Sequence, residues 1–137
     1  MSSRLKLIFH FFISIAIGAG IYLLFRPQTL LVFKWIKIFG IEEILFLRNV
    51  VDVNTPKWFI YSLPDGLWVY GSTILMWAIW HDKFVFWLYI PIICALLTEV
   101  LQMIGSICGT FCLIDVVFYL AGFLCAVIHK REVYLEV

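Results

Sequence analysis

The chain has 137 residues, of which 64% are hydrophobic and 14% are charged, and its formal net charge is +1. Soluble domains average about 45–50% apolar and about 25% charged residues, so this composition indicates an integral membrane protein. A spanning helix takes roughly 20 apolar residues, which limits the chain to one domain of about four spans and excludes an additional soluble catalytic domain. The small net charge and the lack of a long basic run disfavour a nucleic-acid partner.

The first expected element is a membrane span at about residues 7–25. Its apolar run follows Arg4 and Lys6 and stops at Arg26, just before a proline, which disfavours helix in the residue that precedes it. The run is too long for the hydrophobic region of an ordinary signal peptide, so we expect it to remain as an uncleaved span.

The next segment, at about residues 28–50, is too apolar for an ordinary solvated loop. Lys34 and Lys37 would share one face of a helix here, while Trp35 and its apolar neighbours would cover much of the rest. This pattern is typical of a helix that lies in the membrane interface and extends its lysines to the headgroups. A second short helix is expected at about residues 42–50, and a re-entrant segment is the alternative for this part of the chain.

Three further spans are expected, at about residues 65–80, 84–104 and 111–128. The first of them is expected to begin near Asp65, because Pro64 suits a first helical turn and aspartate there faces the positive end of the helix dipole. The last two would form a hairpin that turns near residues 105–109. The expected fold class is therefore all-α, with four transmembrane helices and an interfacial helical segment between the first and the second.

Positive charges hardly distinguish the two orientations of such a fold. If the N-terminus is inside, the positive residues on the inner side are Arg4, Lys6, Lys83, Lys130 and Arg131. Those on the outer side are Arg26, Lys34, Lys37, Arg48 and Lys57. The charges that flank the first span and end the last one lie closest to span ends, where the bias acts most strongly. We therefore expect the N-terminus in the cytoplasm.

Two carboxyl groups lie inside the expected hairpin. Glu99 precedes the turn and Asp115 follows it, each ~12 Å away at a rise of ~1.5 Å per residue. They would share one depth, on the side where Asp65 begins its span and where the loop carries Arg48 and Lys57. An embedded charge costs roughly 2.5–3.5 kcal/mol on insertion scales, and neighbouring carboxylates oppose joint ionisation. Either one carboxyl group stays protonated, or Arg48 or Lys57 compensates the charge, and both alternatives predict a proton-carrying or cation-binding pocket.

Other polar residues share helix faces with these carboxyl groups. Gln102 lies three residues after Glu99, and Asp115, Tyr119 and Gly122 follow an i, i+4, i+7 stripe. The expected ligand-binding residues are Asp65, Glu99, Gln102, Asp115, Tyr119 and Arg48. The alternative is structural: the same side chains would form interhelical hydrogen bonds, with Gly122 allowing close helix approach.

The cysteines do not form a recognisable metal or redox motif. Cys94, Cys108, Cys112 and Cys125 lie in apolar stretches and include no CxxC pair. Free cysteines usually pack as small buried hydrophobes, which is what we expect here. A soft-metal site at the i, i+4 pair Cys108 and Cys112, on one helix face, is the alternative, but neither a metal nor a cofactor is expected.

These polar motifs resemble the signature of the VanZ-like family of small bacterial membrane proteins. The family has an acidic residue and a glutamine three apart, a small turn, and then an aspartate followed at four and seven positions by a polar residue and a glycine. The matching residues here are Glu99, Gln102, Asp115, Tyr119 and Gly122, with "GTF" at 109–111. The resemblance covers about residues 60–128. The family commonly has asparagine in place of Tyr119 and often arginine in place of Gly109.

The resemblance implies a multi-pass protein of the bacterial cytoplasmic membrane that acts at the cell envelope. Its namesake is associated with resistance to the lipoglycopeptide teicoplanin. The expected partners are membrane lipids, a lipid-linked envelope precursor or another amphiphile, and a membrane-protein partner or a second copy of the chain. Two alternatives to ligand binding stay open. One is a structural or assembly subunit of a membrane complex, and the other is a small enzyme that modifies envelope lipid precursors with Glu99 or Asp115 as general base.

Overall fold

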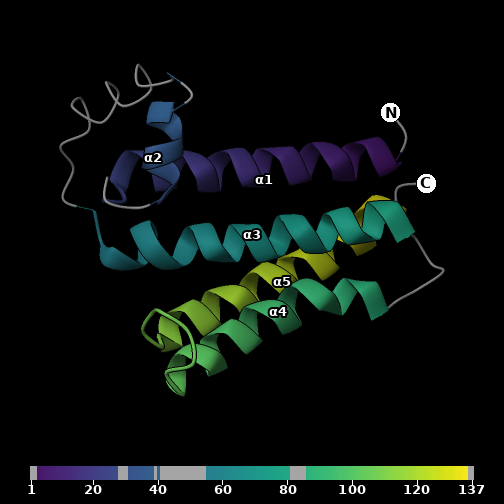
Figure 1. Cartoon of the computed structure of the whole chain (residues 1–137). Coiled ribbons are helices and arrows are strands. Elements are labelled where there is room, and N and C mark those ends of the chain that lie inside the picture. The colour runs from purple at the N-terminus through teal and green to yellow at the C-terminus, as the bar shows by residue number, and fades with distance from the viewer. Residues whose placement is uncertain (1–2, 28–30, 39, 41–54, 81–85, 136–137) are drawn as a thin grey trace.

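The computed structural model describes residues 3–27, 31–38, 40, 55–80 and 86–135, and these residues are all-helical without a strand. The elements are α1 (Ser3–Phe25), α2 (Leu31–Ile38), α3 (Lys57–Trp80), α4 (Phe86–Met103) and α5 (Leu113–Leu135). Helices α1 and α3 and the α4–α5 pair run side by side along a bundle, and α1 begins at the end of the bundle where α5 ends (Figure 1). The all-α prediction is confirmed for the described part of the chain.

Helix α3 is the centre of this bundle and packs against α1, α4 and α5. Apolar side chains from these helices form two buried clusters along it. One consists of Leu7, Ile74, Trp77, Ala78, Leu88 and Ala126, and the other of Val69, Ile92, Ala95 and Tyr119. The second cluster contains Tyr119, so the packing that orders the core also fixes a residue of the predicted site.

Helices α3 and α5 approach each other closely at two glycines. A Cβ atom on Gly66 would lie 2.8 Å from the carbonyl oxygen of Phe118, and one on Gly122 would collide with the carbonyl oxygen of Gly66. Both contacts involve backbone, which cannot turn aside as a flexible side chain would. The predicted close approach at Gly122 is confirmed, and it places Asp65 at the crossing of the two helices.

Three of the described helices are long and apolar enough to cross a membrane, over Arg4–Phe25, Phe86–Met103 and Leu113–Arg131. Helix α3 has the length, with 24 residues, but its many Trp, Tyr, Ser, Thr and Gly residues lower its hydropathy. It packs against the other three helices, α1, α4 and α5. Three of the four expected spans thus have the composition of a membrane-crossing helix.

The predicted start of α3 near Asp65 is wrong, because the helix begins at Lys57 and contains Pro64 in its interior. Proline lacks the N–H that an interior position normally uses, but helices of a packed bundle tolerate it. Tertiary contacts hold the extra turns: the Trp58 ring stacks on Phe118 at 5.8 Å, and the Phe59 ring meets Phe25 edge-on at 5.9 Å.

The described part of the segment between α1 and α3 is mainly the short helix α2. Phe33 is fully buried, whereas Trp35 is 62% exposed and Ile38 is also exposed. Helix α2 thus has a buried face and an exposed apolar face, as an amphipathic helix does. The second helix expected at residues 42–50 lies outside the described residues, as does Arg48.

Candidate functional site

Glu99 is a deeply buried carboxyl group, with 3% of its surface exposed. Its Oε2 accepts a hydrogen bond from the Cys112 backbone N–H at 3.1 Å, and its Oε1 accepts one from the Tyr119 hydroxyl at 3.3 Å. Cys112 directly precedes α5, where backbone N–H groups have no partner within the helix. The Glu99 side chain therefore ties the end of α4 to the beginning of α5.

Asp115 lies in the first turn of α5, where the positive end of the helix dipole favours a carboxylate. Its backbone N–H donates to the Cys112 carbonyl at 3.1 Å. Its Oδ1 atom is buried and has no hydrogen-bond partner among the described residues. One carboxylate oxygen of Asp115 is thus available to a group that the chain itself does not supply.

Asp65 on α3 joins these two carboxyl groups in space. It lies close enough to Glu99 and Asp115 for its carboxyl group to interact electrostatically with theirs. All three carboxyl groups also interact electrostatically with Tyr119. The structure therefore brings together four of the predicted residues from α3, α4 and α5. We call Asp65, Glu99, Asp115 and Tyr119 the acidic site.

The carboxyl groups of the hairpin lie close to the ends of their helices, because the turn between them is non-helical. Glu99 is four residues before the end of α4, and Asp115 is two residues after the beginning of α5. These intervals correspond to ~6 Å and ~3 Å of helix rise, because residues 104–112 form a non-helical turn. Charges close to a helix end cost less in a membrane than charges at its centre.

Gln102 contacts the hairpin turn. A Cβ atom on Gly109 would lie 2.6 Å from Gln102 Nε2, so the glutamine side chain fills the space beside this glycine. Gly109 also has a φ of 139°, a conformation that other residues rarely adopt. Among the described contacts, Gln102 packs against the turn, and none of these contacts joins it to the acidic site.

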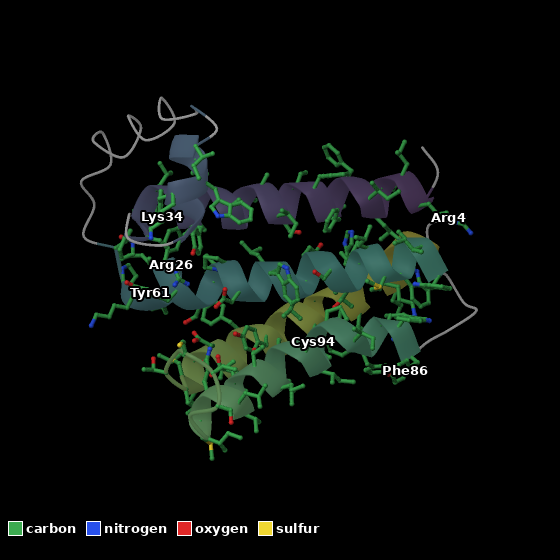
Figure 2. The ribbon with its side chains drawn as sticks, viewed as in Figure 1. Arg4, Arg26, Lys34, Tyr61, Phe86 and Cys94 are labelled. Atoms are coloured by element: carbon green, nitrogen blue, oxygen red, sulfur yellow. The ribbon has the colours of Figure 1, made fainter. Side chains whose placement is uncertain are left out.

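Arg26 is the cation that the structure brings to the acidic site, and sequence reasoning missed it. Its charge acts on Asp65, while its Nη2 donates to the Tyr61 carbonyl oxygen at 3.3 Å. The guanidinium lies 4.4 Å from the Tyr61 ring centre and 5.1 Å from that of Tyr22. Figure 2 shows Arg26 beside Tyr61 at the end of the bundle where α2 lies.

The sequence pointed to Arg48 and Lys57 as the compensating cations. Arg48 lies outside the described residues, and Lys57 is exposed at the beginning of α3. The missed signal was topological: an antiparallel connection places Arg26, at the end of the first span, beside the beginning of the next one.

A cavity of about 170 Å³ borders the acidic site. Its lining residues come from α3, α4 and α5 and are Asp65, Trp68, Cys94, Ala95, Thr98 and Tyr119. Trp68, Cys94 and Thr98 are also exposed, so the cavity opens to the outside between α3 and α4. Cys94 marks the α4 wall in Figure 2. We call this space the acidic cavity.

A second and larger space of about 620 Å³ lies among α1, α2 and α3. Its lining residues are Ser14, Ile15, Gly18, Ala19, Tyr22, Leu23, Ile36, Pro64, Asp65 and Trp68. Most of these side chains are apolar, and we call this space the apolar groove. Asp65 and Trp68 line both spaces, so a carboxyl group and an indole ring stand where the groove meets the acidic cavity.

The cysteines differ from the expectation of buried packing. Cys94, Cys108 and Cys125 are exposed and Cys112 is half-buried, all with free thiols. Cys108 and Cys112 lie in the non-helical turn and therefore do not share a helix face. The exposed cysteine side chains therefore face outward from the bundle and do not pack in its core. Within the described residues, no three His, Cys, Asp or Glu side chains are placed to hold a metal ion.

The fold and the site define a small all-helical protein whose carboxyl groups gather beside an apolar groove. Comparison of the chain with protein-family models, curated proteins and solved structures finds no match. The resemblance to the VanZ-like family therefore stays a prediction from the sequence.

Proposed function

We propose that this protein is a VanZ-like multi-pass protein of the bacterial cytoplasmic membrane that binds an amphiphilic molecule. The polar head of the amphiphile lies in the acidic cavity and its chain lies in the apolar groove. The observation that carries the proposal is the shared wall of the two spaces, formed by Asp65 and Trp68. A molecule with one polar and one apolar end would contact both spaces at once.

A membrane location is supported by the outward surfaces of the long helices. Large apolar side chains are exposed along α1, α4 and α5, among them Phe9, Phe12, Ile17, Ile93, Leu97, Val100, Val117 and Leu124. A soluble protein rarely exposes an apolar surface of this extent. We place α1, α3, α4 and α5 across the membrane with the N-terminus in the cytoplasm and α2 at the opposite interface.

The sizes of the two spaces suit this division of the ligand. The groove, at about 620 Å³, falls within the range of about 300–1,000 Å³ that is usual for small-molecule sites. The acidic cavity, at about 170 Å³, is close to an engineered cavity of about 150 Å³ that admits benzene. An acyl chain gains little by leaving lipid for an apolar groove, because lipid tails are equally apolar. Contacts with the head therefore decide which amphiphile binds.

Two departures from the family pattern are compatible with the VanZ-like proposal. Tyr119, where the family commonly has asparagine, still gives Glu99 a hydrogen-bond donor. Gly109, where the family often has arginine, has a backbone conformation that favours glycine, and Arg26 brings a guanidinium to the site from another helix. A cation is thus available near the carboxyl groups without the arginine of the family.

Lipid retention by matched groove variants tests the proposal. Ala19 lines the groove, whereas Ala16 is exposed on the same helix and does not line it. We expect Ala19→Trp to fill the groove and to lose the lipid that co-purifies with the protein in a gentle detergent. Ala16→Trp should retain as much lipid as the unmodified protein in native mass spectrometry. Equal retention by both variants would overturn the proposal.

The carboxyl groups provide a second test, in cells. We expect expression of the protein to raise the teicoplanin tolerance of a sensitive bacterium. Replacing Glu99 by Gln and Asp115 by Asn together should abolish this protection at an unchanged amount of membrane-inserted protein. Protection that survives the double substitution would separate the acidic site from any role in resistance.

The second candidate is a structural or assembly subunit of a membrane complex. It is favoured by Glu99, because both oxygens of this carboxyl group are already bonded to groups of the same chain. Purification in a gentle detergent distinguishes the two candidates. Co-purification of another membrane protein in fixed proportion would favour assembly, and a lone monodisperse species would count against it.

A further inference from the structure

Aromatic rings and a carboxyl group share the wall of the acidic cavity. Asp65 and Trp68 lie on α3, and Tyr119 faces the same space from α5. Carboxylates attract a cation through charge, and aromatic faces attract it through the ring quadrupole, most strongly for tryptophan. Resting on the amphiphile-binding function above, we propose that the bound amphiphile carries an ammonium group. This group lies in the acidic cavity against Asp65, Trp68 and Tyr119.

The charges around the cavity favour a cation over an anion. Asp65 from α3, Glu99 from α4 and Asp115 from α5 act on the same tyrosine. Arg26, which directly follows α1, carries the positive charge that interacts with Asp65. Its guanidinium is also engaged by two tyrosine rings and the Tyr61 carbonyl oxygen. Three carboxyl groups therefore lie near this cavity, against the one guanidinium whose charge acts on Asp65.

The opening of the cavity also suits an ammonium group at the head of a chain. Trp68 is 48% exposed and forms part of both spaces, so its ring is accessible to a head whose chain lies in the groove. A cavity of about 170 Å³ holds a group the size of a small ring, since an engineered cavity of about 150 Å³ binds benzene. An alkylammonium and a zwitterionic phosphocholine share this ammonium chemistry, and they differ in the phosphate that the second one adds.

A photo-crosslinking competition with amphiphiles of equal chain length tests the inference. The probe is hexadecyltrimethylammonium with a diazirine in its chain, added to the full chain in maltoside micelles. Peptide mapping identifies labelled groove residues such as Ile15 and Leu23. The unlabelled competitors are hexadecyltrimethylammonium, hexadecylphosphocholine, hexadecyl sulfate and hexadecyl glucoside. We expect the two ammonium compounds to compete at least about tenfold more strongly than the sulfate and the glucoside, which is the size of effect expected from a desolvated cation–aromatic contact.

The phosphocholine arm identifies the source of the ammonium group. Stronger competition by hexadecyltrimethylammonium supports a simple cationic amphiphile, and stronger competition by hexadecylphosphocholine supports a zwitterionic lipid head. Either ranking supports the inference, because both compounds present the same trimethylammonium group. Equal competition by all four heads would overturn the ammonium inference while groove labelling upholds amphiphile binding. A lack of specific groove labelling by the probe would overturn both.

Matched variants locate the preference on the cavity wall. Asp65→Asn should reduce the preference for ammonium over glucoside to near unity, and Asp65→Glu should restore it. Trp68→Leu should weaken the preference, whereas Trp35→Leu, at an exposed position on α2 outside both spaces, should leave it unchanged. A preference that persists in Asp65→Asn and in Trp68→Leu would overturn the assignment to this cavity.

Discussion

The polar side chains have different surroundings in the two halves of the bundle. In the half that contains the α4–α5 turn, Asp65, Glu99 and Asp115 gather, and Asp65 lines both the acidic cavity and the apolar groove. In the opposite half, the His10 ring lies 4.2 Å from the His129 ring, between α1 and α5. The Lys130 ammonium lies 3.2 Å from the centre of the Trp77 ring, between α5 and α3. None of these four residues lines the acidic cavity or the groove.

This difference shows that a contact between polar side chains of neighbouring helices is not by itself a sign of a binding site. The histidine and lysine side chains are covered by aromatic rings of neighbouring helices, and their contacts join those helices. The carboxyl groups also make helix contacts, through Glu99, but Asp65 additionally borders space that the chain leaves open. Open space beside a charge is the feature that separates the two halves.

The largest expected effect comes from removing the helix crossing that forms the acidic half. In Gly122→Leu the new side chain would meet the backbone of Gly66, so α3 and α5 would have to separate. We expect a loss of about 3 kcal/mol in the free energy of unfolding, at the upper end of the usual cost of overpacking. Reversible unfolding in mixed micelles measures this loss.

Gly20→Leu is the matched control for this substitution. A Cβ atom on Gly20 would have nothing within 4 Å, although the residue is also a glycine in a long helix. We expect its stability to change by less than about 0.5 kcal/mol, as for most substitutions without a contact. Equal stability of the two variants would show that the α3–α5 approach is not a constraint.

A smaller effect on stability is expected from substitutions of Glu99. These substitutions distinguish a structural role of the acidic site from a ligand-binding role. Glu99→Ala leaves the Cys112 N–H and the Tyr119 hydroxyl without their acceptor, which costs about 2 kcal/mol for buried groups. Glu99→Gln keeps one acceptor oxygen and should cost about half as much. A double-mutant cycle with Tyr119→Phe should give a coupling of about 0.6–1.7 kcal/mol. A stable Glu99→Ala protein would contradict a structural role for this carboxyl group.

The meeting of the carboxyl groups could be predicted from the sequence because hairpin geometry constrains it. Glu99 and Asp115 flank one short turn, so antiparallel helices must bring them to similar depths whatever the rest of the fold does. The close approach at Gly122, three residues after Tyr119 on the α5 stripe, was also predictable, since a small residue on a polar helix face permits close approach.

Lateral packing explains what the sequence did not predict. The helical pattern does not say which helix lies beside which, so the groove among α1, α2 and α3 and the proximity of Arg26 to Asp65 could not be derived. The beginning of α3 was misplaced because the rule for proline is local. The stacking of Trp58 on Phe118 and the contact of Phe59 with Phe25 come from distant parts of the chain and extend the helix beyond Pro64.

The smallest expected effect comes from the aromatic contact in the opposite half. Lys130→Met removes the cation above the Trp77 ring but keeps an unbranched side chain, and we expect a loss of about 1 kcal/mol in unfolding free energy. Arg131→Met, at an exposed neighbouring cation, should have an effect below about 0.5 kcal/mol. Lipid retention should be unchanged in both variants, because neither residue lines the cavity or the groove. If Lys130→Met lost the co-purifying lipid while it kept its stability, the two halves would be coupled through α3 and α5, and ligand binding would no longer belong to the acidic half alone.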